Sequence, residues 1–382
     1  MPLFQREVRM KKILCIPDSF KGTLSSKQVC SLMRDAILNQ DPSIEVITIE
    51  VADGGEGSVD AFLSVLGGEK IDVVVKGPEF VPVQSFFGRL PDGVAVIEMA
   101  AAAGLPMVGD RKNPEIMTTI GVGELIKAAL DTQAPKIILG LGGSCTNDGG
   151  CGAAVALGIR FLDKDGHEFI PTGKTLVDIA TIDCSQRDPR LANITLEVMC
   201  DIDNPMAGLS GAAHIFAPQK GADKAMVERL DRGLVHLAYL IKEQLGLDVS
   251  TLPGGGAAGA MGAGMVAFLG GELKMGIETI LDTVHFDDQI QGADLVLTGE
   301  GRFDTQSLRG KVPVGVARRA KKAGVKVVAV VGAIGENIDE AYDLGITALF
   351  SINTQPVDFA IAKARSADNL YSTVSNLIRI LK

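Results

Sequence analysis

Short apolar runs bounded by turn residues alternate along the chain with segments of helical periodicity. The run ILCIP at 13–17 predicts a buried strand, and SSKQVCSLMRDAILNQ at 25–40 carries its apolar residues at helical spacing. Ser25 is a suitable N-cap for this helix because its hydroxyl can accept a hydrogen bond from the first turn. A second strand, IEVITIEVA at 44–52, leads to Asp53. This alternation is typical of an α/β protein with a mainly parallel sheet.

The last hundred residues repeat the same rhythm. Their strands are continuous apolar runs, as expected for strands covered on both faces of a sheet. The predicted strands lie at 294–301, 326–333 and 346–352, and the predicted helices around 312–323, 338–343 and 358–381.

The middle of the chain has a different pattern. Its strands VAVIEM, KIILGL, IRFL and ITLEVMCDI are unevenly spaced and separated by loops rich in Gly, Pro and Asp. We interpret this as a second α/β domain inserted into the first. The predicted domains are a discontinuous one at 1–77 and 287–382 and an inserted one at 78–286. Because clefts between domains are favoured ligand sites, the active site is expected in the cleft between the two.

Length and composition agree with two globular domains. A chain of 382 residues exceeds what one core usually organises, and its 46% hydrophobic and 22% charged residues are ordinary for a globular protein. The net charge of −10, the absence of Trp and the lack of Lys/Arg clusters argue against nucleic acid as a partner. An anionic substrate would therefore need locally placed cations.

The six cysteines form no CxxC pair and the four histidines are dispersed, so neither a zinc site nor a disulfide framework is indicated. A reducing cytoplasm suits such a chain, and the first residues, MPLFQREVRMKK, lack the apolar core of a signal peptide. The uncharged stretch at 254–271 is too rich in glycine to predict a membrane span and favours a closely packed helix instead. The sequence leaves open whether the chain forms a homo-oligomer.

Two common nucleotide motifs do not apply. The chain contains no GxxxxGK[ST] sequence, so a P-loop kinase is not indicated. A GxGxxG match at Gly254, Gly256 and Gly259 follows VSTLP rather than a strand, and a dinucleotide fold requires that strand.

Four loops combine glycines with carboxylates where apolar runs end. Such loops suit Mg²⁺ and phosphoryl oxygens together, since they supply carboxylates, backbone amides and, in two of them, Lys or Arg. Taken singly, each loop is better explained as an ordinary turn, but four such loops in one chain weaken that explanation. The loops are PDSFKGTLS (17–25), VADGGEGS (51–58), GLGGSCTNDGG (140–150) and TGEGRFDTQSLRGK (298–311).

The order of these loops, together with CDIDNP, FAPQKGA and PGGGAAGAMGAG, resembles the type 1 family of bacterial glycerate kinases from residue 11 onward. The resemblance implies ATP-dependent phosphorylation of D-glycerate, usually to 2-phosphoglycerate, by a flavodoxin-like domain with an inserted α/β domain. The sequence departs from the commoner GGSATNDGGAG at Cys145 and Cys151. Both are interpreted as packing substitutions, because no His neighbours them in the sequence.

A phosphoryl transferase needs a phosphate-binding loop, a metal, a cation and an aligned hydroxyl. We assign phosphate or nucleotide binding to the loop after KIILGL. Its candidate residues are Gly142, Gly143, Ser144, Thr146, Asn147 and Asp148. Asp148 has a second interpretation as a cap of the next helix.

Glycerate needs a cation for its carboxylate and acceptors for its hydroxyl protons. Lys21 with Ser19 and Asp18 is one candidate set, and Arg302 is a second cation. Lys21 is also explained as a solvated loop lysine. Lys220 is noted as able to approach phosphate, whereas His214 is expected to be structural.

Several carboxylates compete for the roles of general base and metal ligand. Asp201, Asp53 and Asp304, with Lys21, form the predicted catalytic set, and Asp201 and Glu300 are the predicted Mg²⁺ ligands. The sequence does not decide which carboxylate has which role, nor which loop binds nucleotide and which glycerate. It also leaves open phosphorylation at the 3-hydroxyl, the metabolic pathway, and a non-catalytic protein that closes on small hydroxy acids.

Overall fold

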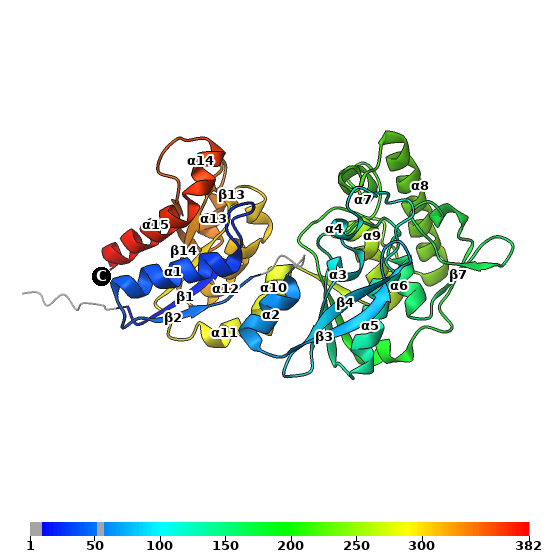
Figure 1. Ribbon diagram of the computed structural model, residues 1–382, viewed down its shortest axis with the longest axis horizontal. Coiled ribbons are helices and arrows are strands. Elements are labelled where there is room, and N and C mark those ends of the chain that lie inside the picture. The colour runs from blue at the N-terminus through cyan, green and yellow to red at the C-terminus, as the bar shows by residue number, and fades with distance from the viewer. Residues whose placement is uncertain (1–9, 52–56, 382) are drawn as a thin grey trace, which may run out of the picture. The chain divides into compact units, whose positions relative to one another are not determined.

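The computed structural model describes residues 10–51 and 57–381, and its internal contacts divide the chain into two compact units. The described residues of 1–52 and 277–382 form unit 1, and those of 53–276 form unit 2 (Figure 1). Each unit has its own hydrophobic core, since the cluster around Ile13 and Leu297 lies within unit 1 and the cluster around Ile137 and Leu234 within unit 2.

Unit 1 is built on a five-stranded parallel sheet with the order β16-β14-β12-β1-β2. Counted within the unit, this order is 2-1-3-4-5, the flavodoxin-like arrangement. The strands are β1 (Lys12–Pro17), β2 (Glu45–Thr48), β12 (Leu295–Gly299), β14 (Lys326–Val331) and β16 (Ile346–Ser351), with short β13 (Arg302–Phe303) and β15 (Ala333–Ile334) paired beyond the sheet. The helices are α1 (Ser26–Gln40), α10 (Gly276–Thr283), α11 (Phe286–Gln289), α12 (Val312–Lys322), α13 (Glu340–Asp343), α14 (Phe359–Ala364) and α15 (Ser366–Leu381).

The helices of unit 1 bury the sheet as its apolar runs predict. Residues Ile13–Ile16 of β1 are fully buried, which fits a strand covered on both faces. Helices α1 and α15 pack side by side, and α12 packs on β12 and β14 (Figure 1). The predicted cap of α1 is confirmed: the Ser25 hydroxyl accepts from Gln28 N, and the Gln28 side chain accepts from Ser25 N. Such a capping box contributes about 1 kcal/mol.

The closing helix predicted for 358–381 is in fact two helices, α14 and α15, separated at Arg365. The buried Ser366 hydroxyl donates to the carbonyl of Ala362, 3.1 Å away. A serine that bonds to the preceding turn weakens or bends a helix, which agrees with a break at this position.

Unit 2 contains a six-stranded mixed sheet with the order β11-β10-β6-β5-β4-β3 and a small antiparallel sheet, β8-β7-β9. Its strands are β3 (Glu69–Lys76), β4 (Pro82–Arg89), β5 (Ala95–Glu98), β6 (Lys136–Gly140), β7 (Arg160–Leu162), β8 (Glu168–Phe169), β9 (Thr181–Asp183), β10 (Thr195–Met199) and β11 (Glu272–Lys274). Its helices are α2 (Ser58–Leu66), α3 (Ala100–Ala103), α4 (Leu105–Val108), α5 (Ile120–Asp131), α6 (Cys151–Ala156), α7 (Ala212–Phe216), α8 (Lys224–Leu240) and α9 (Ala257–Gly264).

In the described part of the chain, the first crossing between the units lies between Val51 and Gly57 and the second at 276/277, both earlier than the predicted 77/78 and 286/287. The reason is pairing that the local sequence does not reveal. Strand β3 pairs with β4 from Glu69 to Lys76, and α2 packs on β4 and β5, so both elements belong to unit 2. That the units are independent domains stays a prediction.

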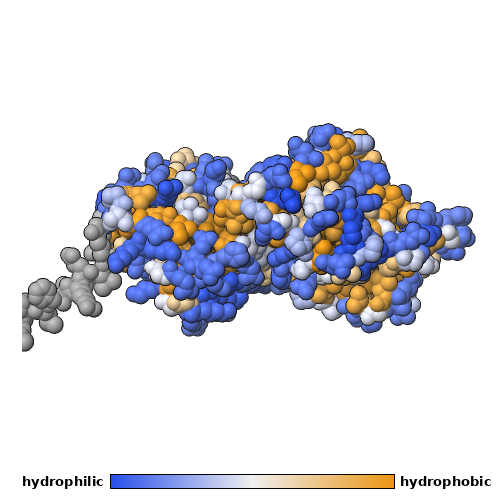
Figure 2. Space-filling view, turned by 90° about the horizontal axis from the view of Figure 1, so that it is seen from below, coloured by the Kyte–Doolittle hydropathy of each residue, from blue (hydrophilic) through white to orange (hydrophobic). Residues whose placement is uncertain are grey.

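Apolar side chains are not confined to the cores. Leu209 is 84% exposed and Ile380 77% exposed, and Figure 2 shows apolar patches on a largely hydrophilic surface. No described helix is long and apolar enough to cross a membrane, and the stretch at 254–271 contains the short helix α9 instead.

Candidate active site

The carboxyl ends of β1 and β12 form the topological switch point of unit 1. These strands are parallel neighbours, with Pro17 opposite Gly299, but the chain leaves β1 toward β2 on one side and leaves β12 toward β14 on the other. Ligands of open α/β sheets bind in the crevice outside such a point. The loops that begin at Asp18 and Glu300 are therefore brought together by the strand order.

A cavity of about 330 Å³ lies at this switch point. It is bounded by the loops after β1, β12, β14 and β16 and by α14 and the start of α15. Its polar lining comprises Asp18, Ser19, Lys21, Thr23, Glu300, Arg302, Asp304, Lys311, Asn353, Lys363 and Ser366, and its apolar lining includes Phe20, Ile352, Phe359 and Ala362. All of the predicted substrate-binding residues are thus in the wall of one cavity.

Glu300 is the most deeply placed carboxylate of this cavity. It is 5% exposed, and its Oε1 is buried without a hydrogen-bond partner among the described residues. Burial, which disfavours the charged form, raises the pKa of Glu300 to about 7. A hydrogen bond from Ser307 and the charge of Lys311 oppose this rise in pKa, whereas the neighbouring carboxylates add to it.

The cations at this cavity differ in solvent exposure and in their side-chain contacts. Arg302 is 71% exposed at its side chain, and its Nε lies 3.4 Å from Asp304 Oδ2. Lys21 is exposed, while Lys311 is half-buried with its Nζ 3.4 Å from Gln306 Oε1. Four cations, with Lys363 as the fourth, and three carboxylates around a small cavity suit an anion that also carries hydroxyl groups. Lys311 belongs to the predicted loop 298–311 but was given no role of its own from the sequence. Phe359 was not singled out, because it lies in a separate segment of the chain.

In unit 2, the loops after three parallel strands meet at one edge of the sheet. Gly140 at the end of β6 is opposite Glu98 of β5 and opposite Met199 of β10. The glycine loop, residues 140–150, therefore begins beside the segment that contains Asp201. The predicted phosphate loop and the predicted base of this unit lie at the same sheet edge.

Lys220 lies beneath the glycine loop. It ends the short 3₁₀ turn Pro218–Lys220, is 2% exposed, and its Nζ donates to Ser144 Oγ and to Thr146 O, each at 2.7 Å. Burial lowers the pKa of Lys220 to about 8, opposed by the charges of Cys145 and Asp148. Burial raises the pKa of the Cys145 thiol to about 12, which makes it a poor nucleophile and fits a packing role.

Asp148 is fully buried and its carboxylate joins the starts of two helices. Its Oδ2 accepts from Thr119 N and Oγ1, each at 2.8 Å, and from Gly152 N at 3.3 Å, while Oδ1 accepts from Gly150 N at 3.2 Å. Desolvation raises its pKa, and these hydrogen bonds oppose the rise. The geometry favours the capping interpretation, and phosphate or nucleotide binding by Asp148 stays a prediction.

The glycine loop contains polar atoms without partners among the described residues. They are Thr146 Oγ1 and both amide atoms of Asn147, and both residues are 0% exposed. A left-handed turn, residues 258–260, packs on them: a Cβ at Gly259 would lie 2.1 Å from Thr146 O, so only glycine fits there. The turn also places Ala258 and Ala260 at positive φ, a strained conformation of the kind that clusters at functional sites.

Asp201 follows β10, and its Oδ1 accepts from Gly276 N at 2.7 Å. Asn204 donates from Nδ2 to Ser210 O, which closes the adjacent loop. The predicted metal ligands Asp201 and Glu300 belong to different units, and Asp53 lies outside the described residues. Glu98, which the sequence did not single out, is 3% exposed and accepts from Val59 N at the start of α2.

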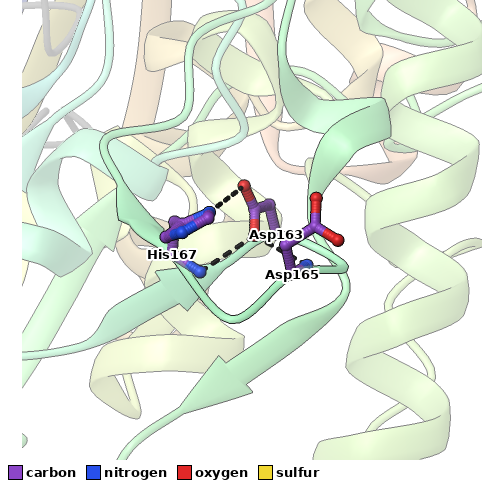
Figure 3. Close-up of side chains that lie close together, drawn as sticks. All are labelled: Asp163, Asp165 and His167. Carbon is purple, nitrogen blue, oxygen red and sulfur yellow. Dashed lines mark hydrogen bonds and ion pairs between the residues drawn. The ribbon is translucent and has the colours of Figure 1, made fainter.

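Within the part of the chain that the structure describes, one group of three potential ligands could hold a metal ion: Asp163, Asp165 and His167 (Figure 3). Asp163 Oδ1 accepts from the backbone N–H of Asp165 and of His167, each at 2.9 Å, and its Oδ2 lies 3.4 Å from His167 Nδ1. These interactions close the tight turn between β7 and β8, so the group is explained as a turn.

The fold and the site together define a class of protein. A flavodoxin-like sheet with a charged cavity at its switch point, and a second unit with a glycine loop held over a buried lysine, are features typical of α/β proteins that bind small polar or anionic molecules.

The comparisons give the family. The model of the glycerate kinase family matches residues 13–382. The chain is 46% identical to a glycerate kinase of Bacillus cereus and 41% identical to glycerate 2-kinase of Escherichia coli, in each case over 97% of this chain and 98% of the relative. The crystal structure of a Salmonella typhimurium LT2 protein assigned as glycerate kinase 2 matches with a TM-score of 0.84 and 40% identity, over 98% of both chains. The chain belongs to the glycerate kinase family and is an enzyme of the kinase class.

Proposed function

We propose that this glycerate kinase transfers the γ-phosphoryl group of ATP to the 2-hydroxyl of D-glycerate, giving 2-phosphoglycerate and ADP. Membership of a kinase family implies ATP as the phosphoryl donor. The 2-hydroxyl is favoured because the Escherichia coli relative, which aligns over nearly the whole chain, is named a glycerate 2-kinase. The observation that carries the proposal is the charged cavity at the switch point of unit 1.

The cavity supports a division of roles among its side chains. Lys21 and Arg302 would bind the glycerate carboxylate, since guanidinium and ammonium groups form charge-assisted hydrogen bonds with carboxylates. Ser19 and Asp18 would bind a glycerate hydroxyl. Asp304, also in the cavity wall, is the described carboxylate of unit 1 that we propose as general base.

In unit 2 the glycine loop would hold the phosphates of ATP through Gly142, Gly143, Ser144, Thr146 and Asn147. Its half-buried Gly142 and exposed Gly143 leave the backbone accessible, and the buried Lys220 supplies positive charge. Asp201 at the same sheet edge, and Asp53, remain proposed catalytic carboxylates.

Mg²⁺ would neutralise charge on the phosphates when bound. Glu300 fits a ligand role, because its Oε1 is buried without a partner among the described residues. Asp201 is the second proposed ligand. Among the described residues neither carboxylate belongs to a group of three candidate ligands, so phosphate oxygens and water would supply the other ligands.

We also propose a cytoplasmic location, since all six cysteines are free thiols.

The test is ADP release on addition of ATP, Mg²⁺ and D-glycerate, with L-glycerate and D-lactate as matched controls. D-lactate keeps the carboxylate and the 2-hydroxyl but lacks the 3-hydroxyl. Phosphorus NMR of the product should show a phosphate on the secondary carbon. A signal from the primary carbon would replace the proposal by 3-phosphoglycerate formation, and binding of hydroxy acids without ADP release would favour the non-catalytic alternative.

A further inference from the structure

The ammonium of Lys220 is buried and forms no direct ion pair with a described carboxylate, although the charge of Asp148 acts on it from further away. Its side chain is 2% exposed, and no carboxylate oxygen of residues 10–51 or 57–381 lies within 4.0 Å of its Nζ. Burial of an unpaired charge is strongly unfavourable, and proteins usually pair such groups. Two of the three N–H groups of the Lys220 ammonium donate to the glycine loop, one to Ser144 Oγ and one to Thr146 O.

The direction of the first of these hydrogen bonds fixes the role of Ser144. An ammonium group only donates, so Ser144 Oγ must be the acceptor of the 2.7 Å hydrogen bond. The hydroxyl proton of Ser144 then points elsewhere, and no described atom is found to accept it. Ser144 is 7% exposed and follows the exposed Gly143 in the glycine loop.

A second observation points to a ligand at the same loop. The buried amide of Asn147 and the hydroxyl of Thr146 lack partners among the described residues. A buried polar group without a hydrogen bond destabilises the fold, so native proteins leave few of them unsatisfied. The loop cannot easily relax to satisfy them, because Gly259 O accepts from Gly149 N and the left-handed turn fills the space behind Thr146.

We propose that Lys220 is a positioning residue of the phosphate site: it holds Ser144 as a hydrogen-bond donor to a phosphate oxygen of the nucleoside triphosphate and places a positive charge directly behind that donor. The hydrogen bond from Lys220 polarises the Ser144 hydroxyl and makes it a stronger donor toward an anion. Lys220 acts through Ser144 and through the carbonyl of Thr146. This inference rests on the proposed phosphate-binding function of the glycine loop.

The first experiment measures binding of inorganic tripolyphosphate to the full-length protein by calorimetry. The variants are Ser144→Ala, Lys220→Met and their double variant, with Lys224→Met as the control, because Lys224 is an exposed lysine four residues further on. Each single variant should weaken binding roughly tenfold or more, as expected for a lost charge-assisted hydrogen bond. The control should bind as the unchanged protein does.

The double variant separates positioning from mere support of the fold. Because Lys220 acts largely through Ser144, replacing Lys220 should lower tripolyphosphate affinity by a clearly smaller factor in Ser144→Ala than in the unchanged protein. Additive losses, or unchanged tripolyphosphate affinity in folded Lys220→Met, would overturn the proposal. If Lys220→Met does not fold, Ser144→Ala decides, and unchanged affinity in Ser144→Ala overturns the donor role.

Kinetics provide an independent readout. Both single variants should raise the KM for ATP with little effect on the KM for D-glycerate. Tripolyphosphate binding needs no glycerate, so it tests the phosphate site separately from catalysis. If the variants lose tripolyphosphate affinity but the unchanged enzyme releases no ADP, the phosphate site is supported and the proposed function is wrong. Equal effects on both KM values would count against a phosphate-specific role.

Discussion

At the scale of single residues, the cations of the two candidate sites differ in burial. In unit 1 the cations of the cavity are exposed or half-buried, whereas the carboxylates Asp18 and Glu300 of its wall are buried. In unit 2 the cation at the glycine loop, Lys220, is buried, as is the Asp148 carboxylate of that loop. Exposed cations attract and release a small anion at little desolvation cost, whereas a buried cation is already desolvated and rigid when the ligand arrives.

Replacement of Lys21 by Ala should raise the KM for D-glycerate about tenfold, with kcat and the KM for ATP nearly unchanged. The reason is that Lys21 lines the unit 1 cavity and is proposed to bind the substrate carboxylate in both ground and transition states. Lys27→Ala is the matched control, since Lys27 is an exposed lysine on α1 away from the cavity lining. An unchanged KM would restore the interpretation of Lys21 as a solvated loop residue.

Because of Lys220, the affinity for anions and the stability of the fold should change in opposite directions as the pH rises. In the folded protein its pKa is about 8, whereas the ordinary value is 10.5, so between these pH values the unfolded chain holds more protons. Its contribution to stability therefore rises with pH across this window, while the charge available to phosphate is lost. The charged and titratable groups facing it, Asp148 and Cys145, both favour the protonated amine.

The measurement is tripolyphosphate affinity between about pH 7 and about pH 9.5. In this range Lys220 loses its charge, whereas an arginine at the same position keeps it. Affinity should fall through pH 8 in the unchanged protein, and Lys220→Arg is the control because arginine stays charged. This control also accounts for titration of tripolyphosphate itself. A parallel fall in Lys220→Arg would assign the pH dependence to another group.

At the scale of elements, the ends of parallel strands bring the chemistry together. The strand order of unit 1 places the loops after β1 and β12 at one switch point, and the register of β5, β6 and β10 aligns three loops in unit 2. The glycine loop then depends on two supports that are remote in sequence, the turn at 258–260 and the start of α5.

Asp148→Asn should lower the free energy of unfolding by roughly 2–4 kcal/mol, because the new amide group would meet N–H donors where the carboxylate now accepts. Urea unfolding of the whole chain measures the change. The control is Asp165→Asn, an exposed position in the β7–β8 turn, where the loss should stay within about 0.5 kcal/mol. A stable Asp148→Asn protein that has lost tripolyphosphate binding would instead show that Asp148 belongs to the ligand site.

At the scale of the whole molecule, unit 2 is one continuous segment with its own core, whereas unit 1 is assembled from both ends of the chain. A fragment of residues 53–276 should therefore fold by itself, with a single cooperative urea transition, and should bind tripolyphosphate. Near-UV circular dichroism and calorimetry check the two parts. A fragment without a cooperative transition would show that unit 2 depends on unit 1 for its fold.

The sequence by itself determined much of this enzyme. Apolar runs of strand length and helical spacing predicted β1, α1, β12, α12, β14 and β16 close to their observed bounds, because each depends on local periodicity. The polar-glycine loops at strand ends identified the family, and the comparisons confirm it.

Only the tertiary structure decided which residues of those loops meet. It placed β3 with β4 in unit 2, brought Lys311 and Phe359 to the cavity of Lys21, and set Lys220 beneath Ser144, a residue 76 positions earlier. It also showed Asp148 to be surrounded by backbone donors. These contacts depend on strand order, register and burial between distant segments, and the local spacing of residue types does not predict them.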